Sequence, residues 1–226
     1  MQFDEVVTTT GAVREFEARP VPDSQVYELL DLARFAPSGG NRQGWRVVVV
    51  KGTELRIRLR ELYVEAWAEY MAHVEAGLVP FAPLNGRRWT GPAVDLDAAA
   101  KRRYEYPFSD HLDEVPVMLA VFVKLGSLAV LDNGLDRQSI VGGGSIYPFV
   151  HNIMLAARSR GLGGVMTTAI CRREPQVAAL MGMPEEYALA SLVALGWPKR
   201  TPSRLRRDPV EKFTTVDTFE GDPFRP

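Results

Sequence analysis

The sequence predicts a layered α/β or α+β domain in which four or five helices surround three or four strands. Three observations predict it. Short β-branched runs bounded by Gly and Pro are typical of buried strands, and longer stretches with apolar residues three and four positions apart are typical of amphipathic helices. The chain has 226 residues, which suits one domain better than two, and it shows no internal repeat. We therefore expect a single domain over residues 1–226.

Helices are expected over residues 23–36 and 142–160, where the apolar spacing is helical. Two more are expected over residues 53–78, which are rich in Leu, Arg and Glu, and over residues 174–181, with Pro175 at the first position. The helix over residues 23–36 ends because Pro37 and the two glycines after Ser38 cannot continue a helix cheaply. The helix over residues 142–160 carries the clearest apolar stripe in the chain, and the three glycines at its start would let another backbone approach closely. Gly161 follows it as a C-terminal stop.

Strands are expected over residues 45–50, 115–124, 165–170 and 188–195. The first run, WRVVVV, is short and β-branched, so we expect both of its faces to be covered. Two regions have no clear period. Residues 80–110 form a surface excursion and a candidate lid. The C-terminal extension, residues 199–226, cannot build a core of its own and must dock on the body, stay disordered or pair with another chain.

Composition excludes several classes of protein. Apolar residues make up 46% and charged residues 24%, and 27 Lys and Arg against 28 Asp and Glu give a net charge of −1. A dedicated nucleic-acid binder would be clearly basic, so none is expected. The longest apolar runs reach about ten residues, short of the roughly 20 that a membrane span needs, and no secretory signal is visible. A single cysteine excludes an internal disulfide framework, and we expect a cytoplasmic protein.

Few residues offer metal or thiol chemistry. No ligand spacing links the three histidines, so we expect surface or capping roles for His73, His111 and His151. Cys171 is followed by Arg172 and Arg173, which could lower the pKa of a thiol. No base accompanies it, so the sequence favours a buried structural cysteine.

The first of three polar clusters is a Gly-rich loop between a helix and a strand. Its polar and constrained residues are Pro37, Ser38, Asn41 and Gln43. Such a loop can present donors and acceptors to the edge of a planar heterocycle, or it can be a turn stabilised by Asn and Ser. Both interpretations stay open at this point.

The other two clusters lie in the C-terminal half. One follows the glycine turn at residues 161–164 and places two hydroxyls at the mouth of a strand: Val165, Met166, Thr167 and Thr168. The alternative is a half-buried strand that happens to carry two threonines. The last cluster has five cations between residues 199 and 207, among them Arg204, Arg206 and Arg207, and indicates an anion site or a solvated face. Arg14 is a lone cation near the N-terminus.

The order and separation of these pieces resemble the FMN-dependent nitroreductase family. Residues 8–50 resemble the family's opening, with a Val-Pro helix start and an Ala-Pro-Ser-x-x-Asn-x-Gln-x-Trp loop. The stretch SIYPFVHNIMLAARSRGLGGVMTT resembles its central helix and Gly-Leu-Gly turn, and MPEEYALASLVALGWP resembles its closing strand. Residues 53–115 match no pattern of the family.

The resemblance implies an α+β, nitroreductase-like fold with a central mixed β-sheet flanked by helices. It also implies a homodimer that exchanges its C-terminal extension between subunits and holds FMN at the interface. Arg14 is then expected at the flavin N1/O2 edge and Arg207 at the phosphate, with Arg204 or Arg206 as alternates. The ring and ribityl side would be lined by Pro37, Ser38, Asn41 and Gln43, and the dimethylbenzene-to-N5 region by Met166, Thr167 and Thr168, preceded by Val165.

One short segment departs from the family pattern. Thr10, Gly11 and Ala12 stand where the family has Arg-Arg-Ser. We expect the Thr10 hydroxyl and the Gly11 N–H to take over part of that role. FMN stays the leading cofactor because the arginine cluster can hold a dianion bidentately.

The activity implied by the resemblance is hydride transfer from NAD(P)H through flavin N5 to a nitroaromatic, a quinone or a similar small acceptor, in a ping-pong sequence. Arg14 would favour negative charge near N1, and Thr167 or Thr168 would donate a hydrogen bond to N5. Alternatives on the same scaffold are a reductive dehalogenase, an enone reductase or a non-catalytic flavin-binding protein. The expected partners are the small electron acceptor and a second copy of the chain, with no nucleic acid and no membrane.

Overall fold

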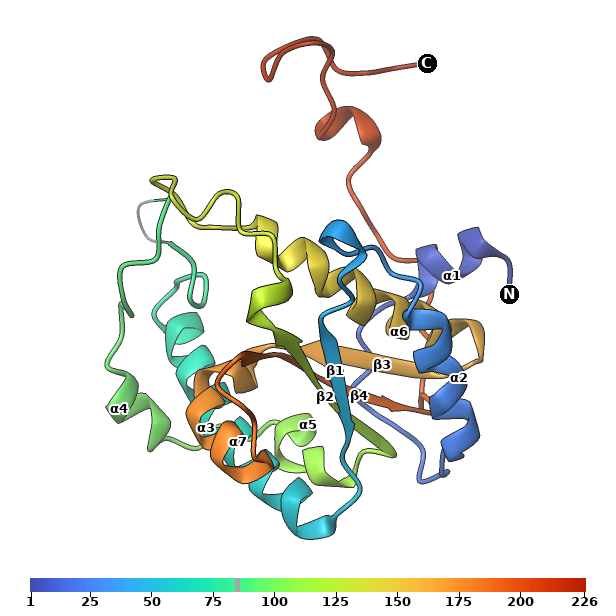
Figure 1. The fold of residues 1–226 in the computed structure, drawn as a ribbon, viewed down its shortest axis with the longest axis vertical. Coiled ribbons are helices and arrows are strands. Elements are labelled where there is room, and N and C mark those ends of the chain that lie inside the picture. Colours follow the sequence, from blue (N-terminus) through green and yellow to red (C-terminus); the bar gives the residue numbers. More distant parts are fainter. Residues whose placement is uncertain (84–85) are drawn as a thin grey trace.

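A central antiparallel sheet organises the protein (Figure 1). The computed structural model describes residues 1–83 and 86–226. In this described part the sheet has four strands in the order β1-β2-β4-β3: β1 Trp45–Val49, β2 Val117–Lys124, β4 Tyr187–Gly196 and β3 Gly163–Thr167. Every neighbouring pair is antiparallel. The α+β class is confirmed, but the mixed sheet is a wrong prediction for these strands, because parallel pairing is reduced to one isolated bridge between Ala12 and Gly164.

Two of the strands differ in detail from their prediction. β1 lies at the sheet edge, and the side chains of Arg46 and Val49 are exposed. The expectation that both faces of this strand are covered is therefore wrong. β3 begins at Gly163 and ends at Thr167, because the chain turns into the 3-10 helix Ala169–Arg173.

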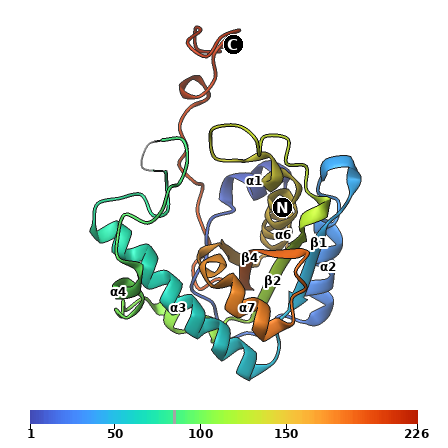
Figure 2. The same ribbon diagram turned by 60° about the vertical axis from the view of Figure 1, so that its left-hand side comes forward.

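Helices cover both faces of the sheet, and β2 shows how the sequence divides them (Figure 2). On one face, Leu119 and Val121 pack against α2 (Asp23–Ala33) and α6 (Tyr147–Ser159). On the other face, Ala120 and Phe122 pack with α3 (Thr53–Glu75) and α7 (Glu174–Met181). Successive side chains of a strand point to opposite faces, so a continuous apolar run serves two cores.

The remaining elements are short. The N-terminal helix α1 (Phe3–Thr9) was not expected from the sequence, and it contacts α6. The candidate lid region contains α4 (Leu96–Ala100), capped by the Asp95 carboxylate, and α5 (Pro107–Asp110), while residues 84–85 lie outside the described part. Further 3-10 turns lie at Gly39–Asn41, Leu112–Glu114, Leu125–Ser127, Val141–Ser145 and Val210–Lys212.

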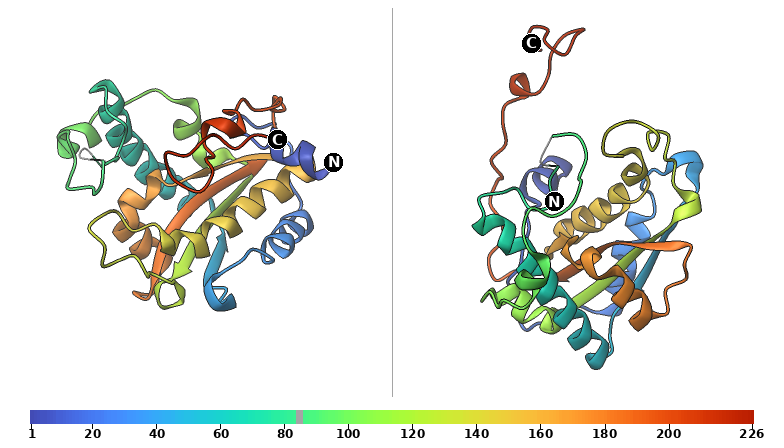
Figure 3. Two further views of the ribbon diagram at one scale, coloured as in Figure 1. Left: turned by 90° about the horizontal axis from the view of Figure 1, so that it is seen from above. Right: turned by 90° about the vertical axis from the view of Figure 1, so that its left-hand side faces the viewer.

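The C-terminal extension divides into two parts (Figure 3). Its first part docks on the N-terminal segment: the Lys199 N–H donates to the Glu15 carbonyl (3.1 Å), and the Leu205 N–H donates to the Thr8 carbonyl (2.8 Å). The second part projects away from the body, folds back on itself near residues 215 and 223, and exposes three aromatic side chains: Phe213, Phe219 and Phe224.

None of the helices in the described ranges is both long and apolar enough to cross a lipid bilayer.

Candidate functional site

The glycine turn before β3 allows the N-terminal segment to lie directly against the sheet. The Val13 N–H donates to the Gly164 carbonyl at 2.7 Å. A Cβ atom on Gly163 would lie 2.7 Å from the Val13 side chain, and one on Gly164 would lie 2.4 Å from the Leu195 side chain. Only residues without a side chain fit here. The close approach fixes the position of Arg14 beside the end of β3.

A cavity of about 610 Å³ lies where these segments meet. Arg14 lines it together with three residues from the end of β3 and beyond: Met166, Thr167 and Thr168. The opposite side is largely aromatic, and its rings come from α3 and from the chain that follows it: Tyr63, Trp67, Tyr70, Phe81 and Trp89. The structure thus brings Arg14 and residues of the second polar cluster to one cavity.

Tyr63 connects the aromatic side to the hydroxyl cluster. Its hydroxyl lies 3.2 Å from the Thr167 hydroxyl. Burial raises the pKa of Tyr63, while the hydrogen bond with Thr167 and the charge of Arg14 oppose that shift to a smaller extent. Tyr63 is therefore neutral at physiological pH, and it can donate its proton to Thr167. The Thr167 proton is then free to be donated into the cavity.

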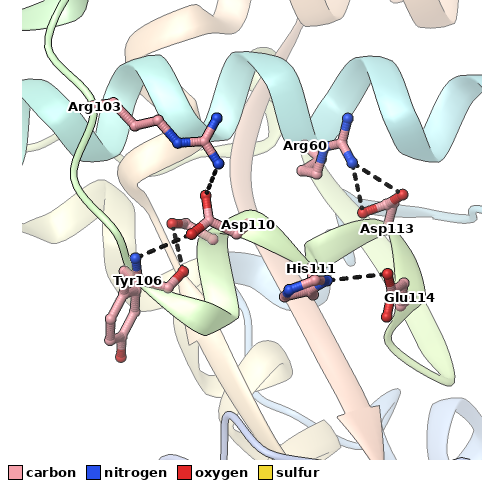
Figure 4. A network of polar contacts seen from close by, with 8 residues as sticks. Arg60, Arg103, Tyr106, Asp110, His111, Asp113 and Glu114 are labelled. Atoms are coloured by element: carbon pink, nitrogen blue, oxygen red, sulfur yellow. Dashed lines mark hydrogen bonds and ion pairs between the residues drawn. The ribbon is translucent and has the colours of Figure 1, made fainter.

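The aromatic wall is held from behind by α5 and the turn after it. The Trp67 ring stacks between Tyr70 and Tyr106, with ring centroids 4.9 Å apart in each pair. Figure 4 shows how Tyr106 is fixed: Asp110 accepts a hydrogen bond from its N–H and pairs with Arg103. Two further pairs, Arg60 with Asp113 and His111 with Glu114, fasten the same turn.

Sequence reasoning did not assign this wall to a site. The signal that could have indicated it is the spacing of four and then three between the aromatic residues of α3, which are Tyr63, Trp67 and Tyr70. Such a stripe is more typical of a core-facing helix than of a binding cavity.

The polar loop before β1 is bonded within itself. The Gln43 N–H donates to the Ser38 hydroxyl (3.0 Å), and the Gln43 amide donates to the Asn41 side chain (3.2 Å). The Gly39 N–H donates to the Ser145 hydroxyl (3.1 Å). Within one chain, the loop is therefore a turn stabilised by Asn and Ser, which is one of the two interpretations that the sequence left open. The residues of this loop, including Pro37, do not line the Arg14 cavity.

The same loop has unusual backbone angles. Asn41 has φ 53° and Gln43 has φ 49°, in the left-handed region. A residue with a Cβ in that conformation costs on the order of 1 kcal/mol. Both side chains are exposed, so the loop places two amide side chains on the surface, each on a residue with a strained backbone conformation.

The arginine cluster lies beside the segment that departs from the family pattern. Leu205 packs over Gly11, where an added Cβ would lie 3.1 Å from the leucine side chain. Arg204, Arg206 and Arg207 are exposed around this contact. The Thr10 hydroxyl donates to the Val6 carbonyl (2.7 Å), and the Gly11 N–H donates to the Thr9 carbonyl (3.0 Å), so both groups already have a partner.

Two expected site residues differ in exposure. Ala12 is exposed next to the bridge with Gly164, whereas Val165 is buried in the core behind α3. Only the backbone of Val165 can face a ligand.

Cys171 also lines the cavity, and its thiol stays protonated at physiological pH. Burial, and next the negative charge of Glu174, raise the pKa of Cys171 to about 12. Its Sγ donates to the Leu189 carbonyl at 3.2 Å. The prediction of a buried structural cysteine is met only in part, because Cys171 is half-buried at the cavity wall. The expectation for the histidines is wrong for His73, which is 3% exposed because the ring packs against Phe81 while Nδ1 donates to the Glu69 carbonyl.

No group of three or more potential ligand side chains that could hold a metal ion is found in the part of the chain that the structure describes.

Asp132 organises the loop that brings Gln138 to the cavity. Its buried carboxylate accepts hydrogen bonds from the Ile140 and Val141 N–H groups, the Ser139 hydroxyl and the Arg137 guanidinium. The bond from Ile140 is the largest contribution to a strongly lowered pKa of Asp132. The lowered pKa means that this carboxylate stabilises the fold wherever it is ionised.

Asp132→Asn is expected to lower the melting temperature at pH 7. A carboxyl with a lowered folded-state pKa contributes fully above its ordinary range near pH 4, and its contribution is lost as the pH falls further. The difference in melting temperature from the wild type should therefore shrink below about pH 4. Asp136→Asn, an exposed change of equal charge in the same loop, is the control. An equal effect of both variants at pH 7 would contradict the role of Asp132.

The fold and the cavity define a class: an α+β domain whose N-terminal cation and β3 hydroxyls face an aromatic wall. Comparison with known proteins identifies that class. The model of the nitroreductase family matches residues 8–197, and the chain belongs to the nitroreductase family. The resemblance inferred from the motifs is thereby confirmed.

Relatives with described activities match nearly the whole chain. Chloronitrobenzene nitroreductase from Comamonas testosteroni is 28% identical over 233 residues, covering 94% of this chain and 96% of that protein. Iodotyrosine deiodinase 1 from Rattus norvegicus is 26% identical over 215 residues, covering 94% of this chain and 68% of that protein.

Solved structures share the fold. A crystal structure of oxidized iodotyrosine deiodinase bound to FMN and 3-iodo-L-tyrosine has a TM-score of 0.66 at 22% identity, covering 96% of this chain and 100% of that chain. The NADPH:FMN oxidoreductase from Vibrio harveyi complexed with NAD+ has a TM-score of 0.66 at 19% identity, covering 96% and 78%.

Proposed function

We propose that the protein is an FMN-dependent oxidoreductase that passes hydride from NAD(P)H to a small acceptor such as a nitroaromatic or a quinone, in a ping-pong sequence. One observation carries the proposal: Arg14 and the hydroxyls of Thr167 and Thr168 converge on one cavity with an aromatic wall. A cation, hydroxyl donors and flat apolar rings are the groups that a planar, electron-accepting heterocycle requires.

The described residues fit FMN. The cavity of about 610 Å³ can take a tricyclic ring. Arg204, Arg206 and Arg207 do not line it, but they are exposed next to the segment of Thr10 and would supply cations for a phosphate there. When bound, FMN supplies the capacity to accept a hydride and to donate it again. Net, NAD(P)H and one solvent proton convert a nitro group into a nitroso group and water.

The chain's own residues bind and orient. Arg14 stabilises negative charge where it develops, because a fixed cation needs no reorganisation. Thr167 is oriented by Tyr63 and can donate its proton into the cavity. Thr168 is the second candidate donor at the same position, with Met166 packing beside it.

A second copy of the chain completes the site in this proposal. Pro37, Ser38, Asn41 and Gln43 then reach the cofactor from the partner subunit, which gives the strained loop a role. The projecting part of the C-terminal extension places its three exposed aromatic rings on the partner. The cytoplasmic location stays a prediction from the sequence.

Reductive dehalogenation is the second candidate. The deiodinase relatives at 26% identity over most of the chain favour it. It would use the same cavity, so it differs from the first candidate in the acceptor alone. A non-catalytic flavin protein and an enone reductase remain predictions from the sequence.

An absorbance spectrum of the purified protein, before and after anaerobic NADH or NADPH, tests the function. We expect a yellow protein that bleaches on addition of the nicotinamide and recovers its colour with a nitroaromatic. A yellow protein that neither nicotinamide bleaches would contradict the reductase, and a colourless protein that FMN does not reconstitute would contradict the cofactor.

Arg207→Ala is expected to weaken FMN binding roughly tenfold to hundredfold, the usual worth of charge-assisted hydrogen bonds. Retained flavin, measured by absorbance after gel filtration, and Kd for added FMN are the readouts. Arg34→Ala, which removes an exposed arginine directly after α2, is the control. Unchanged affinity in the Arg207 variant would move the phosphate site elsewhere.

A further inference from the structure

We propose that the cavity selects aromatic acids and that Arg172 binds their carboxylate. This inference rests on the proposed function, and it names the class of acceptor. The cavity wall that carries Arg172 begins at Ala169, directly after the hydroxyl cluster, and Arg172 lines the same cavity as Arg14.

The charges around the cavity are one-sided. Among the described residues that line it, two are arginines, Arg14 and Arg172, and none is a carboxylate. Gln138 adds an uncharged polar group. An anionic ligand is therefore attracted by the two arginines, whereas a cationic ligand finds no carboxylate among the described lining residues.

Arg172 is held by a buried carboxylate behind the wall. Its Nε lies 3.0 Å from a Glu69 oxygen, and the Glu69 side chain is only 4% exposed. The other Glu69 oxygen binds Arg173 at 2.7 Å, and Arg173 also pairs with Glu65. The Glu69 carboxylate is thus shared by two guanidinium groups, and together with Glu65 the four side chains carry no net charge. Glu69 therefore orients Arg172, and the attraction for a carboxylate comes from the open end of the Arg172 guanidinium.

The outer end of the guanidinium is available. Its Nε is engaged, but within the described ranges neither terminal nitrogen of Arg172 has a partner, and its side chain is 36% exposed. A guanidinium fixed through one nitrogen presents the other two as a planar fork. That fork matches the two oxygens of a carboxylate.

The rings beside Arg172 indicate an aromatic ligand. The Phe81 ring lies 5.2 Å from the guanidinium carbon, and the stacked Trp67 and Tyr70 rings continue the wall. Phe81 itself has φ 56°, a strained conformation for a residue with a side chain. This backbone conformation places an apolar ring next to the Arg172 cation. A ligand with an aromatic ring and an acidic substituent matches this pair, because its ring packs against the aromatic wall while its carboxylate binds the guanidinium.

Matched acceptors test the proposal on the FMN-loaded protein. We expect kcat/KM with 4-nitrobenzoate to exceed that with the uncharged 4-nitrobenzamide about tenfold or more. Arg172→Gln should lower this acid-to-amide ratio about tenfold to hundredfold. Calorimetric Kd values for benzoate and benzamide, which involve no turnover, should change in the same ratio.

Two further variants keep the result interpretable. Arg172→Gln leaves Glu69 buried without one partner and could unfold the protein, so the double variant Glu69→Gln with Arg172→Gln removes both charges together. It should lose acid selectivity to the same extent. Arg58→Gln, an exposed arginine on the outer side of α3, is the control for the loss of one positive charge and should keep the wild-type ratio.

The possible results distinguish the proposed acid selectivity from the proposed oxidoreductase function. Equal acid and amide values in the wild type, with both nitro compounds reduced, would overturn the acid selectivity while the oxidoreductase stands. A variant that raises KM for NADPH but keeps the acid-to-amide ratio would assign Arg172 to the nicotinamide donor and overturn the proposal. Failure to bind FMN or reduce either compound would overturn both.

Discussion

Removal of residues 209–226 is expected to convert the proposed dimer into a monomer, with the mass measured by light scattering falling by half. The segment projects from the body with Phe213, Phe219 and Phe224 exposed, and burial of such rings is worth several kcal/mol in an interface. The cut leaves Leu205 and the arginine cluster in place, so the docking of residues 199–205 on the N-terminal segment is kept.

The truncated protein should also lose most of its FMN, because half of each proposed site comes from the partner's Ser38 loop. Lys212→Ala in the full chain, which removes an exposed pair with Asp208, is the control and should stay dimeric. A truncated protein that keeps the dimer mass would refute the exchanged extension, and a monomer that keeps its flavin would refute the shared site.

Gly164→Ala is expected to destabilise the protein by about 3 kcal/mol, or roughly 6–12 °C in melting temperature for a chain of this size. Its Cβ would lie 2.6 Å from the Ala194 carbonyl oxygen and 2.4 Å from the Leu195 side chain. The carbonyl belongs to the β4 ladder and cannot move without breaking the sheet. The strand must therefore shift, and Arg14 shifts with it.

Gly126→Ala is the matched control for this change. A Cβ at Gly126 meets nothing within 4 Å, and its backbone is not in the left-handed region. We expect its melting temperature to stay close to that of the wild type. Similar melting temperatures for the two variants would mean that the close approach of β3, β4 and the N-terminal segment is not needed for stability.

The strands and long helices were predictable because their signals are local. The β-branched run of β2 and the apolar stripe of α6 fix element type before any tertiary contact forms. α1 was missed because Phe3 and Val7 are exposed and its single buried residue, Val6, sets no period. The partial exposure of β1 follows from its place at the sheet edge, which no local pattern records.

The site was only half predictable for the same reason. Thr167 and Thr168 stood out as hydroxyls after a glycine turn, and Arg14 joined them through the family pattern. Arg172 did not stand out as a cavity residue, because its role depends on Glu69, which lies 103 positions earlier in the chain. The aromatic stripe of Tyr63, Trp67 and Tyr70 on α3 is typical of a core-facing helix, so it did not indicate a cavity wall. Pairings between distant segments decide function here, and a single sequence does not display them.

The contact between Val13 and Gly164 has a consequence for how the molecule matures. Residues 12–16 pair with β3 and with the chain just after β4, so the cation near the beginning of the polypeptide gains its place only when residues up to about 199 have left the ribosome. The placement of Arg14 therefore depends on pairing between segments that lie far apart in the sequence, and such contacts form late in folding.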